Sequence, residues 1–315
     1  MFEYIADLIV YRLGGMAVDD RLAEAVHFFV YDVLKILTLI FFVVSLIAFV
    51  RTYVDAEKFR ARVEKTRFGL GNLLAASFGA VTPFCSCSSI PLFIGFLKAN
   101  VPLGVAFSFL ITSPLVNEVA FVMMGGLFGW RIAVLYAVTG ILLGVVAGLV
   151  IGALGMEKEI ILDKAYGSAP EAARHFSKFS FRVRYALKDG KKTFLKIWIY
   201  VVAGVALGAL IHGYVPQEFF MNYIGRFEYL AVPMAVLLGV PIYAGCSTIA
   251  PVIFSITAGG VPLGTSLALM MSVAGLSLPE AMILKRVMSF KLLGVFFGVV
   301  AVGIVLIGWL FNWVA

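Results

Sequence analysis

Three cysteines carry the most distinctive chemistry of this 315-residue chain, and all three lie in motifs of one kind. Cys85 and Cys87 lie in the stretch VTPFCSCSSIPLF (81–93), between two prolines, and Cys246 opens the similar stretch CSTIAP. Residues i and i+2 of an ideal helix point about 200° apart, so Cys85 and Cys87 can reach one ligand only where the backbone unwinds. Proline removes a backbone donor and disrupts a helix. The motif therefore predicts a break in a helix at which the thiols converge.

Thiols that converge in this way form a soft donor set. Such a set suits thiophilic atoms, such as trivalent arsenic, Cu(I) or sulfur compounds, better than Mg²⁺ or Ca²⁺. Polar side chains of the motifs and of the following segment could line the substrate site, and the expected set is Thr82, Ser86, Ser88, Ser89, Asn117, Ser247 and Thr248. The alternative is that the cysteines are small apolar packing residues. We expect no metal centre and no cofactor, because the three histidines lie at segment ends or in a polar linker.

The composition places these motifs in a membrane protein. The chain is 62% hydrophobic and 14% charged, whereas a soluble domain is about half apolar and about a quarter charged. The apolar segments lack strand-like alternation, and most are close to the ~20 residues with which a helix crosses a bilayer. We therefore expect an all-α polytopic membrane protein with eight apolar segments, at residues 28–50, 69–97, 102–124, 131–155, 194–213, 230–258, 262–284 and 291–313.

The two halves of the chain repeat one design. Cys87-Ser88-Ser89-Ile90 recurs as Cys246-Ser247-Thr248-Ile249 at a displacement of 159, and VPLG at residue 101 recurs at residue 261. With two residues of slippage, Glu118 corresponds to Glu280. The matches predict two membrane repeats of about 120 residues, in units 28–155 and 194–315. The remaining units are an interfacial N-terminal segment (1–27), which lacks the basic start of a signal peptide, and a linker (156–193).

Lys and Arg counts orient the segments, because cytoplasmic loops are enriched in these residues. The loop 51–67 holds six and the linker 156–193 holds nine. If the Cys-bearing segments 69–97 and 230–258 enter and leave on one side, 19 of the 23 basic residues outside the segments are cytoplasmic; if all eight segments cross, 11 are. This favours broken or re-entrant Cys-bearing segments, a cytoplasmic linker and repeats of inverted topology. Inverted repeats are a common transporter architecture.

Two glutamates and a row of glycines also stand out within the apolar segments. Ionisable groups at membrane depth are functional candidates by default, so Glu118 and Glu280 could carry protons for antiport. The alternative is that each lies near a segment end and reaches the membrane interface. The glycines recur every fourth residue, which is typical of close helix packing, and they are Gly140, Gly144, Gly148 and Gly152.

The motifs resemble those of a known family. TPFCSCS (82–88), TSPLVN (112–117) and GCS (245–247) are similar to motifs of the predicted permeases that include ArsP-type organoarsenical efflux proteins, and the resemblance extends from about residue 28 to residue 313. It implies a multi-pass permease of the plasma membrane without an ATPase domain. It also implies arsenical resistance by export of trivalent organoarsenicals through a cysteine-rich site, which falls here on Cys85, Cys87 and Cys246.

The leading hypothesis is a secondary transporter, not an enzyme, that exports a small thiophilic or sulfur-containing solute by proton antiport. Two alternatives stay open at this point. The first is a thiol-redox membrane protein whose cysteines exchange electrons with a thioredoxin-like partner, and the second is a channel. The net charge of +7 lies mainly in two loops and indicates orientation in the membrane, so no nucleic-acid partner is expected. A homo-oligomer is left open.

Overall fold

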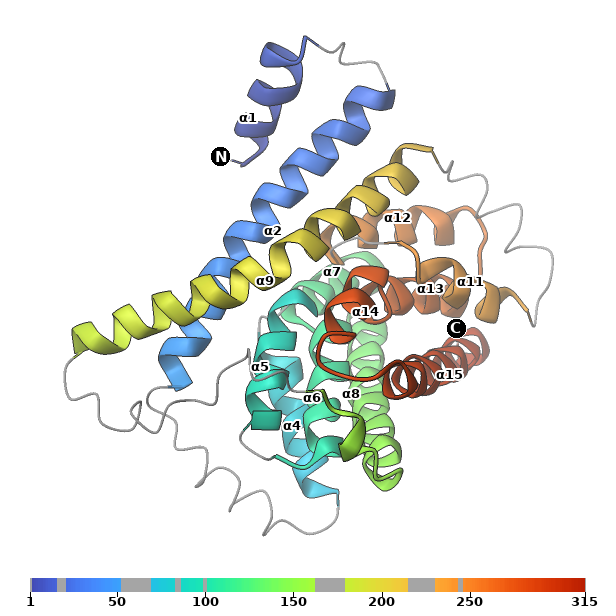
Figure 1. Cartoon of the computed structure of the whole chain (residues 1–315). Helices are drawn as coiled ribbons and strands as arrows, with labels where there is room; N and C mark the ends of the chain where they lie inside the picture. Colours follow the sequence, from blue (N-terminus) through green and yellow to red (C-terminus); the bar gives the residue numbers. More distant parts are fainter. Residues whose placement is uncertain are drawn as a thin grey trace.

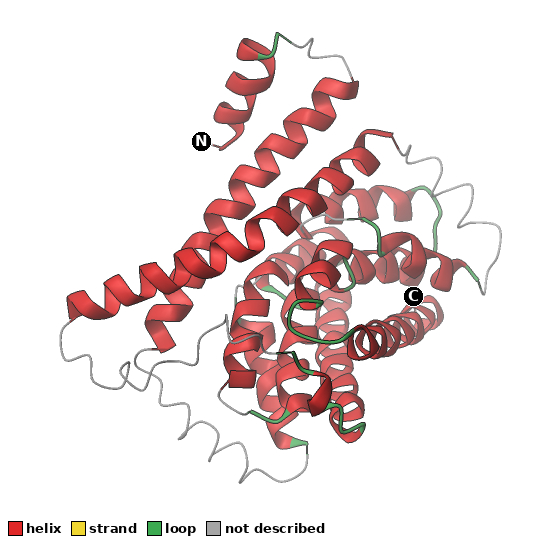
Figure 2. Cartoon of the chain, in the orientation of Figure 1, coloured by secondary structure: helices red, strands yellow, loops and turns green. Residues whose placement is uncertain are grey.

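The computed structural model of the chain is a bundle of helices, and its described residues contain no β-strand (Figures 1 and 2). This confirms the predicted all-helical fold. The described residues are 2–15, 21–51, 69–82, 86–98, 101–161, 179–214, 230–242 and 246–314.

Five successive helices form a first unit in the first half of the chain. They are α4 (Leu70–Val81), α5 (Ser86–Lys98), α6 (Leu103–Leu115), α7 (Glu118–Phe128) and α8 (Trp130–Ala153). Local chemistry sets several of their ends. Pro102 precedes α6, where its missing N–H is not needed, and Gly129 joins α7 to α8 with φ 91°, a conformation that glycine adopts without strain.

A second unit repeats this order. It consists of α11 (Ala231–Gly239), α12 (Cys246–Ala258), α13 (Leu263–Gly275), α14 (Leu278–Leu284) and α15 (Phe290–Val314). The starts of α5 to α8 and of α12 to α15 match one to one at a constant offset, and the matched pairs are Ser86 with Cys246, Leu103 with Leu263, Glu118 with Leu278 and Trp130 with Phe290. The same sequence of short, broken and long helices is thus present twice.

Two long helices lie beside these units. α2 (Arg21–Arg51) and α9 (Phe179–Tyr214) pack along each other and run in opposite directions (Figure 1). The rings of Phe41 and Phe194 meet edge to face at 5.9 Å between α2 and α9. α9 begins at Phe179, so residues 179–193, which the sequence predicts as part of a linker, are helical.

The N-terminal segment folds back on α2. It consists of α1 (Phe2–Asp7) followed by a π-helical turn (Leu8–Leu13). The His27 imidazole lies 2.9 Å from a carboxylate oxygen of Asp7, and the ring of Tyr11 stacks on His27. A single-turn 3₁₀-helix (Glu157–Glu159) follows α8.

α6 and α13 form the centre of the bundle. Every residue of α6 is buried, as is almost every residue of α13. α6 packs against α4, α5 and α8, and α13 packs against α11, α12 and α15. The two central helices also contact each other, where the side chain of Leu115 lies against the backbone of Gly275. The core is therefore shared by both units.

Glycines allow α8 and α15 to approach the central helices α6 and α13 closely. An added Cβ at Gly148 would meet the backbone of Gly104 and the side chain of Ser108, and one at Gly144 would meet the side chain of Thr112. The second unit has the same contact, because a Cβ at Gly264 would meet the carbonyl oxygen of Gly308. The close packing predicted from the glycine row is confirmed.

Three described helices are long and apolar enough to cross a membrane: Trp130–Ala153, the run Leu263–Leu284 formed by α13 and α14, and Phe290–Val314. α6 and α7 together make a fourth such element, bent by 43°. The sequence predicts residues 102–124 as one uninterrupted segment, and the structure instead bends this segment near Val116 and Asn117. Pro114, near the end of α6, contributes to this interruption.

Candidate functional site

The cysteine motifs lie at interruptions between helices, as the sequence predicts. α4 ends at Val81, Thr82 has an extended backbone, and α5 begins at Ser86. In the second unit α11 ends at Gly239 and α12 begins at Cys246. In each unit a short helix therefore leads to the motif and a second helix starts from it.

Most of the predicted thiol and hydroxyl groups lie outside the described part of the structure. Residues 83–85, which include Cys85, and residues 243–245 are not described. The same holds for the side chains of Ser86, Cys87, Ser88, Cys246, Ser247 and Thr248, although their backbone forms the first turns of α5 and α12. Ser89 is fully buried. Convergence of the three thiols stays a prediction.

The structure changes the register in which the two motifs correspond. The sequence matches Cys87 to Cys246 at a displacement of 159. The helices α6, α7 and α8 instead relate to the second unit by a constant offset of their starts, and the same offset places Cys246 opposite Ser86. The two alignments differ because the first pairs residues of the same type, whereas the second pairs residues at the same position in corresponding helices.

Each motif helix packs against the other unit. α5, which begins at the first cysteine motif, packs on α14, which carries Glu280, and α12, which begins at Cys246, packs on α7, which carries Glu118. α5 and α12 are not among the helix pairs that pack extensively in the described structure. The fold thus pairs each cysteine-bearing helix with the glutamate-bearing helix of the other unit.

Two of the predicted polar site residues cap helices. The Thr82 hydroxyl donates to the carbonyl oxygens of Phe78 and Gly79, at 2.8 and 3.1 Å, and so satisfies the end of α4. The Asn117 side-chain oxygen accepts a hydrogen bond of 2.8 Å from the Ala120 N–H at the start of α7. Both side chains therefore stabilise the interruptions whether or not they also touch substrate.

The two glutamates have different surroundings. Glu118 is exposed in the first turn of α7, whereas Glu280 is only 2% exposed. Neither carboxylate oxygen of Glu280 has a hydrogen-bond partner in the described structure. At the offset of the helix starts, the counterpart of Glu280 is the fully buried Ala120, and the counterpart of Glu118 is the exposed Leu278. The two acids therefore do not occupy equivalent positions, and the slippage needed to match them in sequence is not present in the helices.

Ser277 is a polar residue that the sequence reasoning missed. It is 1% exposed, and its hydroxyl has no hydrogen-bond partner among the described residues. The available signal was its place three residues before Glu280, since Ser-x-x-Glu is the pattern of a helix capping box. Three other buried hydroxyls lack a partner in the described structure: those of Thr112 and Ser266 on the central helices and that of Ser45 on α2.

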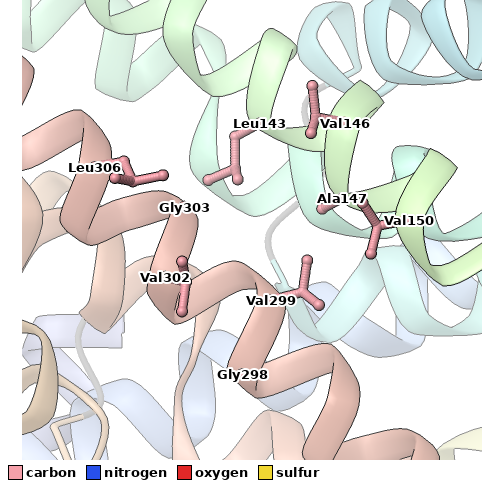
Figure 3. A pocket seen from close by; sticks show the side chains of 9 residues that line it. All are labelled: Leu143, Val146, Ala147, Val150, Gly298, Val299, Val302, Gly303 and Leu306. Carbon is pink, nitrogen blue, oxygen red and sulfur yellow. The ribbon is translucent and has the colours of Figure 1, made fainter.

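An apolar groove of 340 Å³ lies between α8 and α15 (Figure 3). Its lining is formed by Leu143, Val146, Ala147, Val150, Gly298, Val299, Val302, Gly303 and Leu306. None of these side chains carries a thiol, hydroxyl or charge, and none belongs to the predicted substrate site. In the part of the chain that the structure describes, no three His, Cys, Asp or Glu side chains form a metal site.

Comparison with known proteins identifies the family. Residues 21–313 match the model of a family described as predicted permeases. The chain belongs to the ArsP_1 family of predicted permeases. The match covers both five-helix units and the helices α2 and α9, so it extends along nearly the whole length of this permease.

Curated relatives of this permease are distant but cover most of it. The UPF0718 protein YraQ of Escherichia coli is 25% identical over 248 residues, covering 76% of this chain and 66% of the relative. A putative two-component membrane permease complex subunit of Streptococcus mutans is 24% identical over 235 residues, covering 71% and 75%. A UPF0718 protein of Methanocaldococcus jannaschii is 22% identical over 272 residues, covering 69% and 74%. No solved structure matches the chain.

Proposed function

We propose that this permease exports a small thiophilic or sulfur-containing solute, of the trivalent organoarsenical type, across the plasma membrane by secondary-active transport. The observation that carries the proposal is the position of both cysteine motifs at interruptions between helices, each packed against a helix of the other unit. Interrupted helices at membrane depth are tolerated where they line a cavity or are buried in protein. Cys85, Cys87 and Cys246 supply soft donors there, and the neighbouring hydroxyls of Ser86, Ser88, Ser89, Ser247 and Thr248 solvate the polar part of the substrate.

The two units act as inverted repeats in this proposal. Their equal helix order at a constant offset supports the repeat. α2 precedes the first unit and α9 precedes the second, and the opposite directions of these two helices support the inversion (Figure 1). The segment between the units is then cytoplasmic, and both ends of the chain are external. Single cysteines at positions 5, 175 and 315, introduced into a variant without native cysteines, test this with a membrane-impermeant thiol reagent. Labelling of position 175 from the same side as position 315 would contradict the inversion.

The long helices suggest how the site opens to alternate sides. α2 packs on α5, and α9 packs on α14. When each helix is replaced by its counterpart in the other half, these pairs become α9 with α12 and α2 with α7, which have no comparable packing in the described structure. Inverted repeats reach the opposite-facing state when the two units exchange their surroundings. We therefore expect α9 to pack on α12, and α2 on α7, in the second state of the transport cycle.

Coupling to a proton gradient is assigned first to Glu280. An ionised carboxylate is costly to bury without a partner, so a carboxyl in this place is suited to take up and release a proton as its surroundings change. The packing of α14 on α5 links that event to the cysteine-bearing helix. Coupling through Glu118, which is exposed on α7, stays a prediction that substitution decides.

Reconstitution tests the function. The purified chain in liposomes with an inward proton gradient is expected to move phenylarsine oxide, a trivalent organoarsenical, against its concentration gradient. Movement only down the gradient would indicate a channel, and electron exchange with reduced thioredoxin but no solute movement would indicate the redox alternative; either result overturns the proposal. Because the Streptococcus mutans relative is named a complex subunit, a parallel reconstitution with the product of any adjacent permease gene tests whether a second subunit is required.

A further inference from the structure

Glu280 and Ser277 place three buried oxygen atoms without partners within one helical turn. The two residues are 2% and 1% exposed, and neither the carboxylate oxygens nor the hydroxyl forms a hydrogen bond in the described structure. Positions three apart at a helix start have Cβ atoms about 5–6 Å apart. Such a group of buried polar atoms is costly unless something binds to it.

Helix capping does not account for these oxygens. The sequence Ser277-Leu-Pro-Glu280 fits a capping box, in which each side chain bonds a backbone N–H of the other residue. Ser277 makes no side-chain capping bond in the structure. The matched position of the first unit behaves differently, because Asn117 does cap α7 through the Ala120 N–H at 2.8 Å. The second unit therefore has the sequence of a capping box at Ser277 and Glu280, but the Ser277 side chain forms no capping hydrogen bond there.

The surroundings favour a cation. α13 ends at Gly275, two residues before Ser277, and the last turn of a helix presents backbone carbonyls with partial negative charge. The opposing positive end of α14 is partly satisfied, because the Leu278 N–H donates to the Val240 carbonyl and the Ala281 N–H to the Ser277 carbonyl. Pro279 adds no N–H donor. Carboxylate, hydroxyl and carbonyl oxygens together form a hard donor set, and helix C-terminal ends with unwound carbonyls are where membrane transporters bind Na⁺.

The charge count limits the cation to one positive charge. Glu280 is the only acidic residue in α5, α13 and α14, and the single acid of α9, Asp189, is outside the described side chains; Ca²⁺ and Mg²⁺ sites use more carboxylates or retain several waters. α14 also packs on α9, whose described charged side chains are Arg182, Arg184, Lys188 and Lys191, and Lys285 and Arg286 follow α14. None of these groups pairs with the Glu280 carboxylate.

We propose that Glu280 and Ser277, with carbonyls at the end of α13, bind one sodium ion. This rests on the proposed function only in making sodium a coupling ion that competes with the proton for the Glu280 carboxylate, because the site itself is defined by buried oxygens and not by substrate. Sodium would neutralise the carboxylate and satisfy the hydroxyl oxygen at once. A proton would also neutralise the carboxylate and supply an O–H that can donate to the hydroxyl oxygen, so sodium and the proton are the two occupants that the binding assay distinguishes.

Equilibrium binding of radioactive Na⁺ to the purified full-length chain, at fixed pH and with choline chloride holding the ionic strength constant, tests the site. We expect saturable binding of one Na⁺ per chain that a tenfold excess of K⁺ does not displace. Glu280→Gln should abolish it, Ser277→Ala should weaken it about tenfold or more, and Ser277→Thr, which keeps a hydroxyl, should retain it. Glu157→Gln, a change at an exposed glutamate outside the units, is the matched control and should bind as the unaltered chain does.

Absence of saturable Na⁺ binding, or equal binding by Glu280→Gln, would overturn the proposal and indicate a site occupied by water or a proton alone. If Glu280→Gln does not fold, the Ser277→Ala and Ser277→Thr pair decides, because equal binding by both removes Ser277 from the site. The assay contains neither arsenical nor gradient, so its outcome is independent of the transport test. Sodium binding without arsenical transport would count against the proposed function alone.

Discussion

The two five-helix units share one scaffold and differ in the polar groups placed on it. In the first unit Asn72 donates to Ser108 between α4 and α6 at 2.9 Å, and the matched residues Val232 and Ala268 are apolar. The second unit has its own polar pair, since Asn312, whose counterpart is Gly152, donates to Thr265 at 3.2 Å. The close contacts between central and long helices recur in both units. Scaffold geometry therefore depends on small residues at matched positions, while the polar residues are free to differ.

The two units differ most in their polar groups at the starts of α7 and α14, the helices that follow the central ones. Asn117 closes the start of α7 with a capping bond, and the matched Ser277 leaves its hydroxyl and the Glu280 carboxylate without partners in the described structure. Ala120 and Glu280 occupy the same buried position. The first unit is thus built for a stable interruption, and the second offers oxygen atoms to a ligand. This comparison teaches that two units with the same helix order can differ in which buried polar groups they leave without partners.

The largest expected effect concerns what both units are proposed to share, the thiol site. Replacing Cys85, Cys87 and Cys246 together by serine preserves side-chain volume and removes the soft donors. We expect affinity for phenylarsine oxide to fall at least about a hundredfold, or about 2.8 kcal/mol. Calorimetric titration measures the affinity, and an unchanged thermal midpoint shows that the variant is folded. Binding at the level of the unaltered chain would assign the cysteines to packing.

Glutamate substitution is the direct way to break the comparison. Glu280→Gln should remove accumulation driven by the proton gradient while arsenical binding is retained, because the buried carboxyl is replaced by a group of similar shape that cannot carry a charge. Glu118→Gln should have the smaller effect, since Glu118 is exposed. Initial rates of gradient-driven uptake into proteoliposomes measure both. Equal losses in the two variants would show that the acids work as a pair despite their different burial.

Glycine substitution tests the shared scaffold. Gly148→Ala places a methyl group against Gly104 and Ser108 and should destabilise the protein by about 1–3 kcal/mol. Gly298→Ala is the matched control on α15, where an added Cβ meets nothing within 4 Å, and should be neutral or stabilise by about 0.5–1 kcal/mol. Thermal unfolding in detergent measures the two midpoints. Similar midpoints would mean that α6 and α8 do not approach as closely as the structure indicates.

The smallest effect separates the two helix starts. Asn117→Ala should cost about 1 kcal/mol, because a capping bond is lost. Ser277→Ala, measured in sodium-free buffer, should cost less than about 0.5 kcal/mol, because Ser277 makes no capping bond. Equal losses in thermal stability would indicate that Ser277 caps α14 in solution. If Ser277 binds sodium as proposed, adding sodium should stabilise the unaltered chain and not the Ser277→Ala variant.

The sequence by itself determined the properties that depend on composition and on neighbouring residues. The apolar segments predicted helices, the proline-bounded motifs predicted the interruptions that follow Val81 and Gly239, and the glycine row predicted close packing of the helix that carries it, α8. These features follow from local backbone chemistry and side-chain size, which no distant contact has to supply. The motifs TPFCSCS and TSPLVN also carried the resemblance to the permease family that the chain proves to belong to.

Only the tertiary structure decided which polar groups are buried and which helices meet. From the sequence, Glu118 and Glu280 looked equivalent, but Glu280 is buried on α14, which packs on α5 and α9, while Glu118 is exposed on α7. The helix register likewise replaced the match of Cys87 to Cys246 with that of Ser86 to Cys246. Burial and register result from contacts between segments far apart in the chain, so residue type and spacing cannot supply them.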